Sequence, residues 1–297
     1  MLRVGYFPNI THAQGVIGAQ TTREGRGWFE QRLGPGVTVR WYAFNAGPGA
    51  MEALLAGSLD LTYVGPNPAL NVYFRSQGEE IRILAGAAEG GAALVVREGS
   101  GIVSAADFRG RRLATPQLGN TQDVAARVWL ARQGFHPTLA GGDVTIWTTA
   151  NPDLPALFQA GRVDAAWTVE PWVSRLVQEA GGRIFLEQAD AVTTVLVARA
   201  DFLRGHPGLA GKFLAAHLEL TDWINLQPEA ARELVRTGLA AEMKRAMPAA
   251  LMASAWPRLR FTGKVSRAQF EVLVADARRA GFLREAIPLD RLFSGQP

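Results

Sequence analysis

Two segments of this chain, about a hundred residues apart, follow the same order of landmarks. The segment 56–68 (AGSLDLTYVGPNP) begins with Ala-Gly, continues with an Asp and a short apolar run, and ends in a Pro-containing turn. The segment 160–172 (AGRVDAAWTVEPW) repeats this order. Gly just after a helix is typical of the helix C-terminus, and Pro fits the first helical turn because its missing N–H would be unpaired there. Each segment therefore predicts a helix end, a short strand and the start of a new helix.

The correspondence extends to both sides of these segments. Residues 37–39 (VTV) match 144–146 (VTI), and residues 4–9 resemble 113–120, so each half reads strand–helix–strand–helix–strand. The offset is far longer than the roughly 20–50 residues of a solenoid repeat, which indicates two similar lobes. Short strands that alternate with helices favour an α/β fold with parallel sheets. In such sheets, ligands bind outside the carboxyl ends of the strands.

The predicted architecture is a two-lobed α/β fold with a ligand cleft between the lobes. We expect residues 1–88 and 198–297 to form the first lobe and residues 89–197 the second. After Asp201 the pattern is only helical, with helices expected at about 208–226, 228–239, 244–255 and 266–280. This tail has no cluster of catalytic residue types, and we expect its helices to pack on the first lobe.

Composition excludes several classes of function. The 297 residues carry a net charge of +4, but no Lys/Arg run alternates with aromatic residues, so nucleic acid is not an expected partner. The absence of Cys excludes disulfides, a thiol nucleophile and Cys-ligated metals. The four His residues have no metal-ligand spacing, and neither a nucleophile elbow nor a phosphate-binding loop is present. We therefore expect no enzymatic activity, no metal and no cofactor.

Three expected helix starts lie on the same side of the two lobes, near Asn9–His12, Asn67–Pro68 and Asn120–Thr121. Each offers unpaired N–H groups and the positive end of a helix dipole. Together they predict an anion site that needs neither Lys nor Arg. His12 can donate a further hydrogen bond to the ligand. Alternatively, each Asn or Thr only caps its own helix, and His12 only stabilises its turn.

Aromatic and acidic residues also fall in the expected cleft loops. Aromatic residues at strand ends and turn entries can either wall an apolar part of the ligand or pack between the lobes; these are Tyr6, Phe7, Tyr63, Trp147, Trp167 and Trp172. Glu89 precedes Gly90-Gly91 beside the expected hinge, where it can pair with an ammonium group of a zwitterionic ligand or remain solvated. Glu170 either contributes to the ligand site, fixes its own turn or bridges the lobes.

Four motifs resemble a known family: residues 5–12 (GYFPNITH), 64–68 (VGPNP), 119–123 (GNTQD) and 169–172 (VEPW). They are similar to the substrate-binding proteins of ABC importers for aliphatic sulfonates, nitrate and taurine, the NMT1-like family. The resemblance spans about residues 2–198 and implies a type II periplasmic binding fold, with hinge strands crossing at 87–94 and 193–197. By this resemblance, the anion-binding positions are Asn9, His12, Asn67, Asn120, Thr121 and Gln122.

The resemblance implies a monomeric protein that captures a small organic anion and delivers it to a membrane permease. It would be periplasmic, or extracellular and membrane-anchored, with its leader absent from this chain. Many relatives have Ser where this chain has Glu89, which favours a taurine-like zwitterion over a plain alkanesulfonate or nitrate. The alternatives are a binding protein for a thiamine-precursor pyrimidine and an NMT1-like or menaquinone-pathway enzyme. Pyrimidine synthase relatives use a pyridoxal-phosphate lysine and a Cys-rich segment, whereas this chain has no Cys and its lysines are Lys212, Lys244 and Lys264 in the tail.

Overall fold

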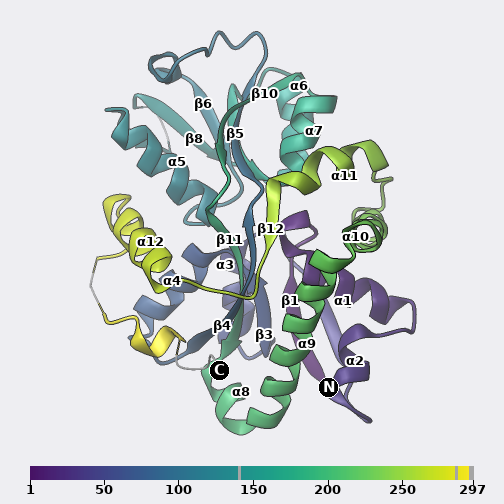
Figure 1. The fold of residues 1–297 in the computed structure, drawn as a ribbon. Helices are drawn as coiled ribbons and strands as arrows, with labels where there is room; N and C mark the ends of the chain where they lie inside the picture. Colours follow the sequence, from purple (N-terminus) through teal and green to yellow (C-terminus); the bar gives the residue numbers. More distant parts are fainter. Residues whose placement is uncertain (140–141, 285–286, 294–297) are drawn as a thin grey trace.

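A computed structural model describes residues 1–139, 142–284 and 287–293. It contains two six-stranded sheets, with strand orders β12-β4-β11-β3-β1-β2 and β10-β5-β9-β6-β8-β7. Figure 1 shows the first sheet in the lower part of the molecule and the second in the upper part, with helices around each. The predicted two-lobed α/β architecture is confirmed.

The first sheet is formed by β1 (Leu2–Tyr6), β2 (Val39–Ala43), β3 (Leu61–Val64), β4 (Ile81–Gly90), β11 (Val192–Arg199) and β12 (Leu259–Phe261). The second is formed by β5 (Ala92–Arg97), β6 (Arg112–Thr115), β7 (Pro137–Thr138), β8 (Val144–Thr148), β9 (Ala165–Val169) and β10 (Gly182–Gln188). Helices α1 (Ala13–Arg23), α2 (Trp28–Leu33), α3 (Gly47–Leu55) and α4 (Pro66–Arg75) accompany the first sheet, and α5 (Thr121–Arg132), α6 (Leu154–Gln159) and α7 (Trp172–Glu179) accompany the second. The tail contains α8 (Ala200–Gly205), α9 (Pro207–Leu226), α10 (Pro228–Met243), α11 (Ala249–Ala255) and α12 (Arg267–Arg279).

The repeat seen in the sequence corresponds to the parallel part of each sheet. In the first sheet β3 and β2 flank β1, and in the second β9 and β8 flank β6, all in parallel. The aspartates of the repeat occupy equivalent places. Asp60 accepts hydrogen bonds from the backbone N and Nε of Arg3 at 2.9 and 3.1 Å. Asp164 accepts the same pair from Arg112 at 2.9 and 3.4 Å.

The chain passes from the first sheet to the second between β4 and β5, and returns between β10 and β11. All five residues of β9 and all but one of the eight in β11 are buried, as expected for central strands covered by helices on both faces. The division into lobes at residues 88 and 198 stays a prediction. None of the helices in the described ranges is long and apolar enough to cross a membrane.

The tail differs from the expectation in two ways. It is not purely helical, because β12 pairs antiparallel with β4 at the edge of the first sheet; three residues are too few to produce a recognisable periodic pattern. It also does not pack on the first lobe alone, because α11 contacts α7 and α12 contacts both α4 and α5 (Figure 1). Helix α11 begins later than the expected residue 244, since Lys244 is left-handed and ends α10 while Pro248 precedes α11.

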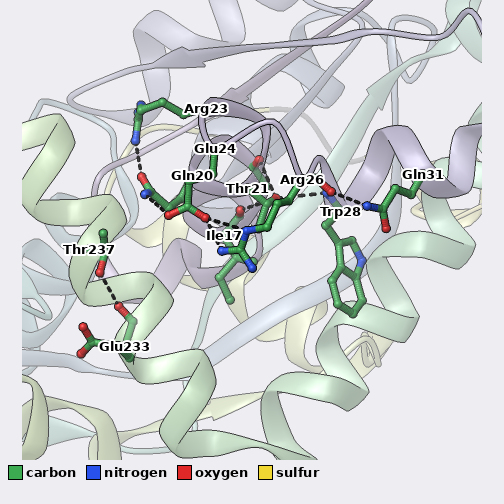
Figure 2. A network of polar contacts seen from close by, with 11 residues as sticks. Ile17, Gln20, Thr21, Arg23, Glu24, Arg26, Trp28, Gln31, Glu233 and Thr237 are labelled. Atoms are coloured by element: carbon green, nitrogen blue, oxygen red, sulfur yellow. Dashed lines mark hydrogen bonds and ion pairs between the residues drawn. The ribbon is translucent and has the colours of Figure 1, made fainter.

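Side-chain hydrogen bonds fix the end of α1 that lies away from the cleft loops (Figure 2). Thr21 Oγ1 donates to the carbonyl of Ile17 at 2.9 Å and accepts from the backbone N of Trp28 at 3.1 Å. This hydroxyl therefore joins the last turn of α1 to the first residue of α2. Gln31 Nε2 donates to the carbonyl of Arg26 at 2.6 Å and holds the connecting loop. Helix α1 also packs against α10.

Candidate functional site

A cavity of about 30 Å³ lies between the two sheets. Almost all of its lining follows the carboxyl ends of the parallel strands in both sheets, as the α/β architecture predicts. The lining residues are Phe7, Asn9, Thr11, His12, Asn45, Ala46, Gly47, Gly65, Pro68, Pro116, Asn120, Thr121, Gln122, Asn151, Val169 and Thr193. Six of the residues expected in the ligand site are therefore brought together here: Phe7, Asn9, His12, Asn120, Thr121 and Gln122.

The cavity is surrounded by the beginnings of helices. Helices α3, α4 and α5 start at its wall, as do the short 3₁₀ turns Ile10–His12 and Asn151–Asp153. At α5, Asn120 is the N-cap, and its Oδ1 accepts from the backbone N of Asp123 at 2.8 Å. The first-turn amides of Thr121 and Gln122 have no partner within the helix and project from this end. The site therefore presents N–H donors and positive helix-dipole ends.

Asp123 fixes the loop that carries these donors. In a capping box the side chain at this position would bond back to the N-cap residue, but the Asp123 carboxylate reaches one residue further. Its Oδ2 accepts from the backbone N of Gly119 at 2.9 Å and from Arg127 Nε at 3.0 Å, and its Oδ1 accepts from Thr115 Oγ1 at 3.0 Å. The loop between β6 and α5 is therefore held at both ends by one fully buried carboxylate.

No described residue that lines the cavity carries a formal charge at neutral pH. The one titratable side chain among them, His12, is buried, and burial lowers its pKa to about 3, so its imidazole is neutral. Its Nδ1 accepts from the backbone N of Phe7 at 3.4 Å, which assigns the proton to Nε2. The ring also stacks on Phe7, with centroids 4.2 Å apart. His12 is thus a fixed neutral donor.

Asn9 does not cap its helix, contrary to the simple expectation for Asn before a helical turn. It makes no side-chain cap hydrogen bond. Its Oδ1 accepts instead from Nε1 of Trp172, at 2.8 Å, and both side chains are buried. Trp172 begins α7 beside the second sheet, so this bond connects the two lobes at the cavity.

Asn67 lies next to the cavity but does not line it. The N-cap of α4 is Gly65, and the backbone N of Asn67 in the first helical turn donates to Thr121 Oγ1 at 3.4 Å. The Asn67 side chain lines a neighbouring cavity of about 160 Å³. Its Nδ2 and Oδ1 are both buried without a hydrogen-bond partner.

Gly65 allows the starts of α4 and α5 to approach each other. A Cβ at this position would lie 2.5 Å from Thr121 Oγ1, which is closer than real Cβ contacts. Any larger residue would therefore push Thr121 away from the site. The close approach brings donors from both lobes to one side of the cavity.

Four expected site residues lie outside this cavity lining: Asn67, Glu89, Trp147 and Glu170. Both oxygens of Glu89 have partners, since the carboxylate forms an ion pair with Arg260 and accepts from Gln269 Nε2 at 3.0 Å. Trp147 lies at the end of β8 with 39% of its surface exposed, and the Arg112 guanidinium lies 5.7 Å from its ring centre.

Glu170 lies behind the cavity, where it fixes its own turn and also connects the lobes. Its carboxylate accepts from the backbone N and Oγ of Ser174 at 3.0 and 2.9 Å, and pairs with Arg258 of the tail at 3.3 Å. Its carbonyl accepts from the backbone N of Ile10 at 3.0 Å, and its N–H donates to Gly91 O at 2.8 Å. Burial raises the pKa of this carboxyl, while Ser174 and Arg258 oppose the increase.

Several lining residues were not expected from the sequence, notably Asn45 and Asn151. They follow β2 and β8, which are equivalent strands of the repeat. The repeat could therefore have indicated both residues, because it relates the loop after β2 to the loop after β8. Within the described residues, no group of three His, Asp or Glu side chains is placed to hold a metal ion.

A family model, curated relatives and solved structures all resemble this chain. A model of the NMT1-like family matches residues 1–240. The taurine-binding periplasmic protein of Escherichia coli K12 is 26% identical over 215 residues, which cover 68% of this chain and 64% of that protein. The chain thus aligns with slightly less than two thirds of this curated relative's length.

Solved structures resemble the chain over nearly its whole length. The periplasmic aliphatic sulphonate binding protein SsuA from Escherichia coli has a TM-score of 0.69 at 26% identity, with 94% of this chain and 90% of that chain covered. The alkanesulfonate-binding protein SsuA from Xanthomonas axonopodis pv. citri, bound to MOPS, has a TM-score of 0.74 at 21% identity, with 99% and 97% covered.

Proposed function

Because the chain belongs to the NMT1-like family, we propose that it is the substrate-binding component of an ABC importer. It captures a small organic anion of the sulfonate type between its two lobes and delivers it to a membrane permease. The relatives named as taurine- and sulfonate-binding proteins support this assignment. A monomeric protein located outside the cytoplasm, in the periplasm or anchored to the outer face of the membrane, fits the same role.

One observation carries the proposal: a cavity lined by helix starts and by no formally charged side chain among the described residues. Such a site stabilises an anion through backbone amides and helix dipoles. The first-turn amides of α5, the imidazole Nε2 of His12 and the hydroxyl of Thr121 are the donors that we assign to the anion. With no charged acid or base on its lining, the cavity is better suited to binding than to proton-transfer catalysis.

The structure favours a plain anion over a zwitterion. A taurine-like ligand would need a carboxylate for its ammonium group, and Glu89 was the candidate. Its oxygens are engaged by Arg260 and Gln269, so we now assign Glu89 to the packing of the tail on β4 rather than to the ligand. A cavity needs about 10–15 Å³ to hold one water, so about 30 Å³ suits a compact anionic head group.

The test is a thermal-shift panel with methanesulfonate, taurine, nitrate, sulfate and an aminopyrimidine. A ligand at a hundredfold its dissociation constant stabilises the folded state by about 2.7 kcal/mol. We expect a clear upward shift in Tm with methanesulfonate. A shift with the aminopyrimidine alone would replace this proposal with the thiamine-precursor alternative, and no shift with any anion would overturn it.

A further inference from the structure

Four amide side chains on the cavity wall share one feature: the oxygen of each is already bonded to a donor of the protein. These side chains are Asn9, Asn120, Gln122 and Asn151. Building on the proposed function, we infer that Thr168, which lies behind Asn151, is a positioning residue that decides which oxyanions the site accepts. Because it holds the Asn151 amide with its nitrogen free, the site favours an oxyanion without a proton over one of equal charge that carries an O–H group.

Three of the four orientations follow from partners that can only donate. The Oδ1 of Asn9 accepts from the indole Nε1 of Trp172 at 2.8 Å. The Oδ1 of Asn120 accepts from the backbone N of Asp123 at 2.8 Å, and its Nδ2 in turn donates to Gln122 Oε1 at 3.2 Å. An indole and a backbone N–H have no acceptor, so none of these amides can turn round without losing its bond.

The fourth amide depends on a hydroxyl. Thr168 is fully buried near the end of β9, and its Oγ1 donates to Oδ1 of Asn151 at 2.8 Å. A hydroxyl can donate or accept, but the Thr168 hydrogen has no other acceptor among the described residues. The reverse orientation of Asn151 would leave this hydrogen buried and unpaired, which is costly. Thr168 therefore keeps the Asn151 oxygen turned into the protein.

The nitrogen ends of Asn9 and Asn151 are left for the ligand. Each side chain lines the cavity and is 5% exposed. Neither Nδ2 has a hydrogen-bond partner among the described residues, and neither is fully buried. Asn9 follows β1 and Asn151 follows β8, so the two sheets each supply one of these donors. They add to the first-turn amides of α5 and to His12, whose Nδ1 is likewise occupied by the backbone N of Phe7.

A set of donors held in this way distinguishes oxyanions by their protonation state. A sulfonate presents three oxygens that only accept, so it satisfies these donors. A singly ionised phosphonate has the same charge and nearly the same shape, but one of its oxygens carries a hydrogen. That hydrogen gives up its bond to water and faces N–H groups instead, which costs affinity. The lining hydroxyls of Thr11, Thr121 and Thr193 can still accept, so we expect discrimination and not complete exclusion.

The experiment compares methanesulfonate with methylphosphonate by isothermal titration calorimetry on the full chain. At about pH 5.5 a phosphonate mostly keeps its second proton, as a phosphate monoester does below about pH 6, so both ligands carry one negative charge. We expect methanesulfonate to bind the original protein at least tenfold more tightly. If neither ligand binds, the proposed function fails and this inference fails with it. If methanesulfonate binds but methylphosphonate binds equally well, the inference is wrong and the proposed function stands.

Thr168→Val tests the positioning role. The change keeps the shape of the side chain and removes the hydroxyl, so the Asn151 amide is free to turn its oxygen to the ligand. We expect the preference for methanesulfonate to fall to less than a third of its original value. Thr168→Ser should keep the preference, because Ser retains the donor. Thr194→Val is the matched control, since Thr194 is another buried threonine, outside the cavity lining, whose Oγ1 has no hydrogen-bond partner among the described residues.

Asn151→Asp gives a second measurement, which keeps the inference testable if Thr168→Val does not fold. Thr168 Oγ1 can still donate to one carboxylate oxygen, and the other oxygen replaces Nδ2 with an acceptor at the ligand. The new charge weakens the binding of both anions, but only methylphosphonate can donate a hydrogen bond to it. The ratio of the two affinities should therefore move toward methylphosphonate. A ratio that stays unchanged in either variant would overturn the inference.

Discussion

Trp172 and Asn9 are joined by a hydrogen bond of 2.8 Å, although 163 positions separate them in the sequence. The indole belongs to the first turn of α7 in the second lobe, and the amide follows β1 in the first. The backbone bond from Ile10 N to Glu170 O, at 3.0 Å, lies beside it. The two lobes are thus connected at the cavity itself. We propose that these bonds form when the lobes close around a ligand.

Trp172→Phe should weaken sulfonate binding. The change keeps an aromatic ring but leaves the buried Oδ1 of Asn9 without its donor, which costs about 1–3 kcal/mol in the closed state only. We expect the dissociation constant for methanesulfonate to rise roughly 5- to 150-fold. Titration calorimetry measures this, with Trp147→Phe as control because Trp147 lies outside the cavity lining. Equal affinities in the two variants would contradict the role of the Trp172–Asn9 bond.

Asn120→Asp should weaken anion binding without disrupting α5. Asp is as good an N-cap as Asn, so the hydrogen bond to the backbone N of Asp123 is retained. The new carboxylate stands beside the anion, and like charges repel strongly where water is excluded. We expect at least a tenfold loss of affinity that becomes smaller at high salt.

The matched control for this prediction is Asn120→Ser, which keeps a capping oxygen and adds no charge. Its affinity for methanesulfonate should stay much closer to that of the original protein. If Asn120→Asp binds as well as Asn120→Ser, the anion does not sit at the start of α5.

The features that could be predicted from sequence are those encoded locally or by the repeat. The repeated strand–helix pattern correctly predicted two related sheets, and the equivalent bonds of Asp60 to Arg3 and Asp164 to Arg112 explain why an Asp recurs at the same place. The cap at Asn120 was also predictable, because its partner Asp123 is three residues away.

The side-chain roles that could not be predicted from the sequence depend on partners that are distant along the chain. Glu89 looked available because its neighbours are glycines, but its ion-pair partner Arg260 is 171 positions later, on a strand of only three residues. Asn9 had the pattern of a cap, and nothing local indicates that its oxygen turns to Trp172 instead. Tertiary packing decides both cases, and periodicity carries no information about it.

Glu89→Gln should leave ligand preference unchanged. The ratio of the affinities for taurine and methanesulfonate should match that of the original protein, because the carboxylate already pairs with Arg260 and Gln269. The cost should appear as a loss of stability of about 1 kcal/mol, since Arg260 is largely exposed and its ion pair is screened by solvent. A selective loss of taurine affinity would restore Glu89 to the ligand site.

Two buried histidines should make the protein less stable as the pH falls below about 6.5. Burial lowers the pKa of His12 to about 3 and that of His217 to about 4. His217 is held neutral in a chain in which Tyr63 Oη donates to its Nδ1 at 3.0 Å and its Nε2 donates to Gly86 O at 2.8 Å. The unfolded chain takes up protons at these residues from about pH 6.5, whereas the folded chain does not until pH 4 or 3. Their stabilising contribution is therefore complete above pH 6.5 and is lost as the pH falls toward the folded-state values.

Urea unfolding at pH 7, 6 and 5 measures this loss. Each histidine should contribute up to about 1.4 kcal/mol per pH unit within this window. Glu170 acts in the opposite direction, because its raised pKa stabilises the folded state at lower pH. The original protein is therefore compared with a histidine variant, since both contain Glu170 and its effect cancels. His217→Gln should be less stable at pH 7 and show a slope smaller by about 1 kcal/mol per pH unit between pH 6 and 5. An unchanged slope would mean that His217 is already protonated in the folded protein and that its Nδ1 does not accept from Tyr63.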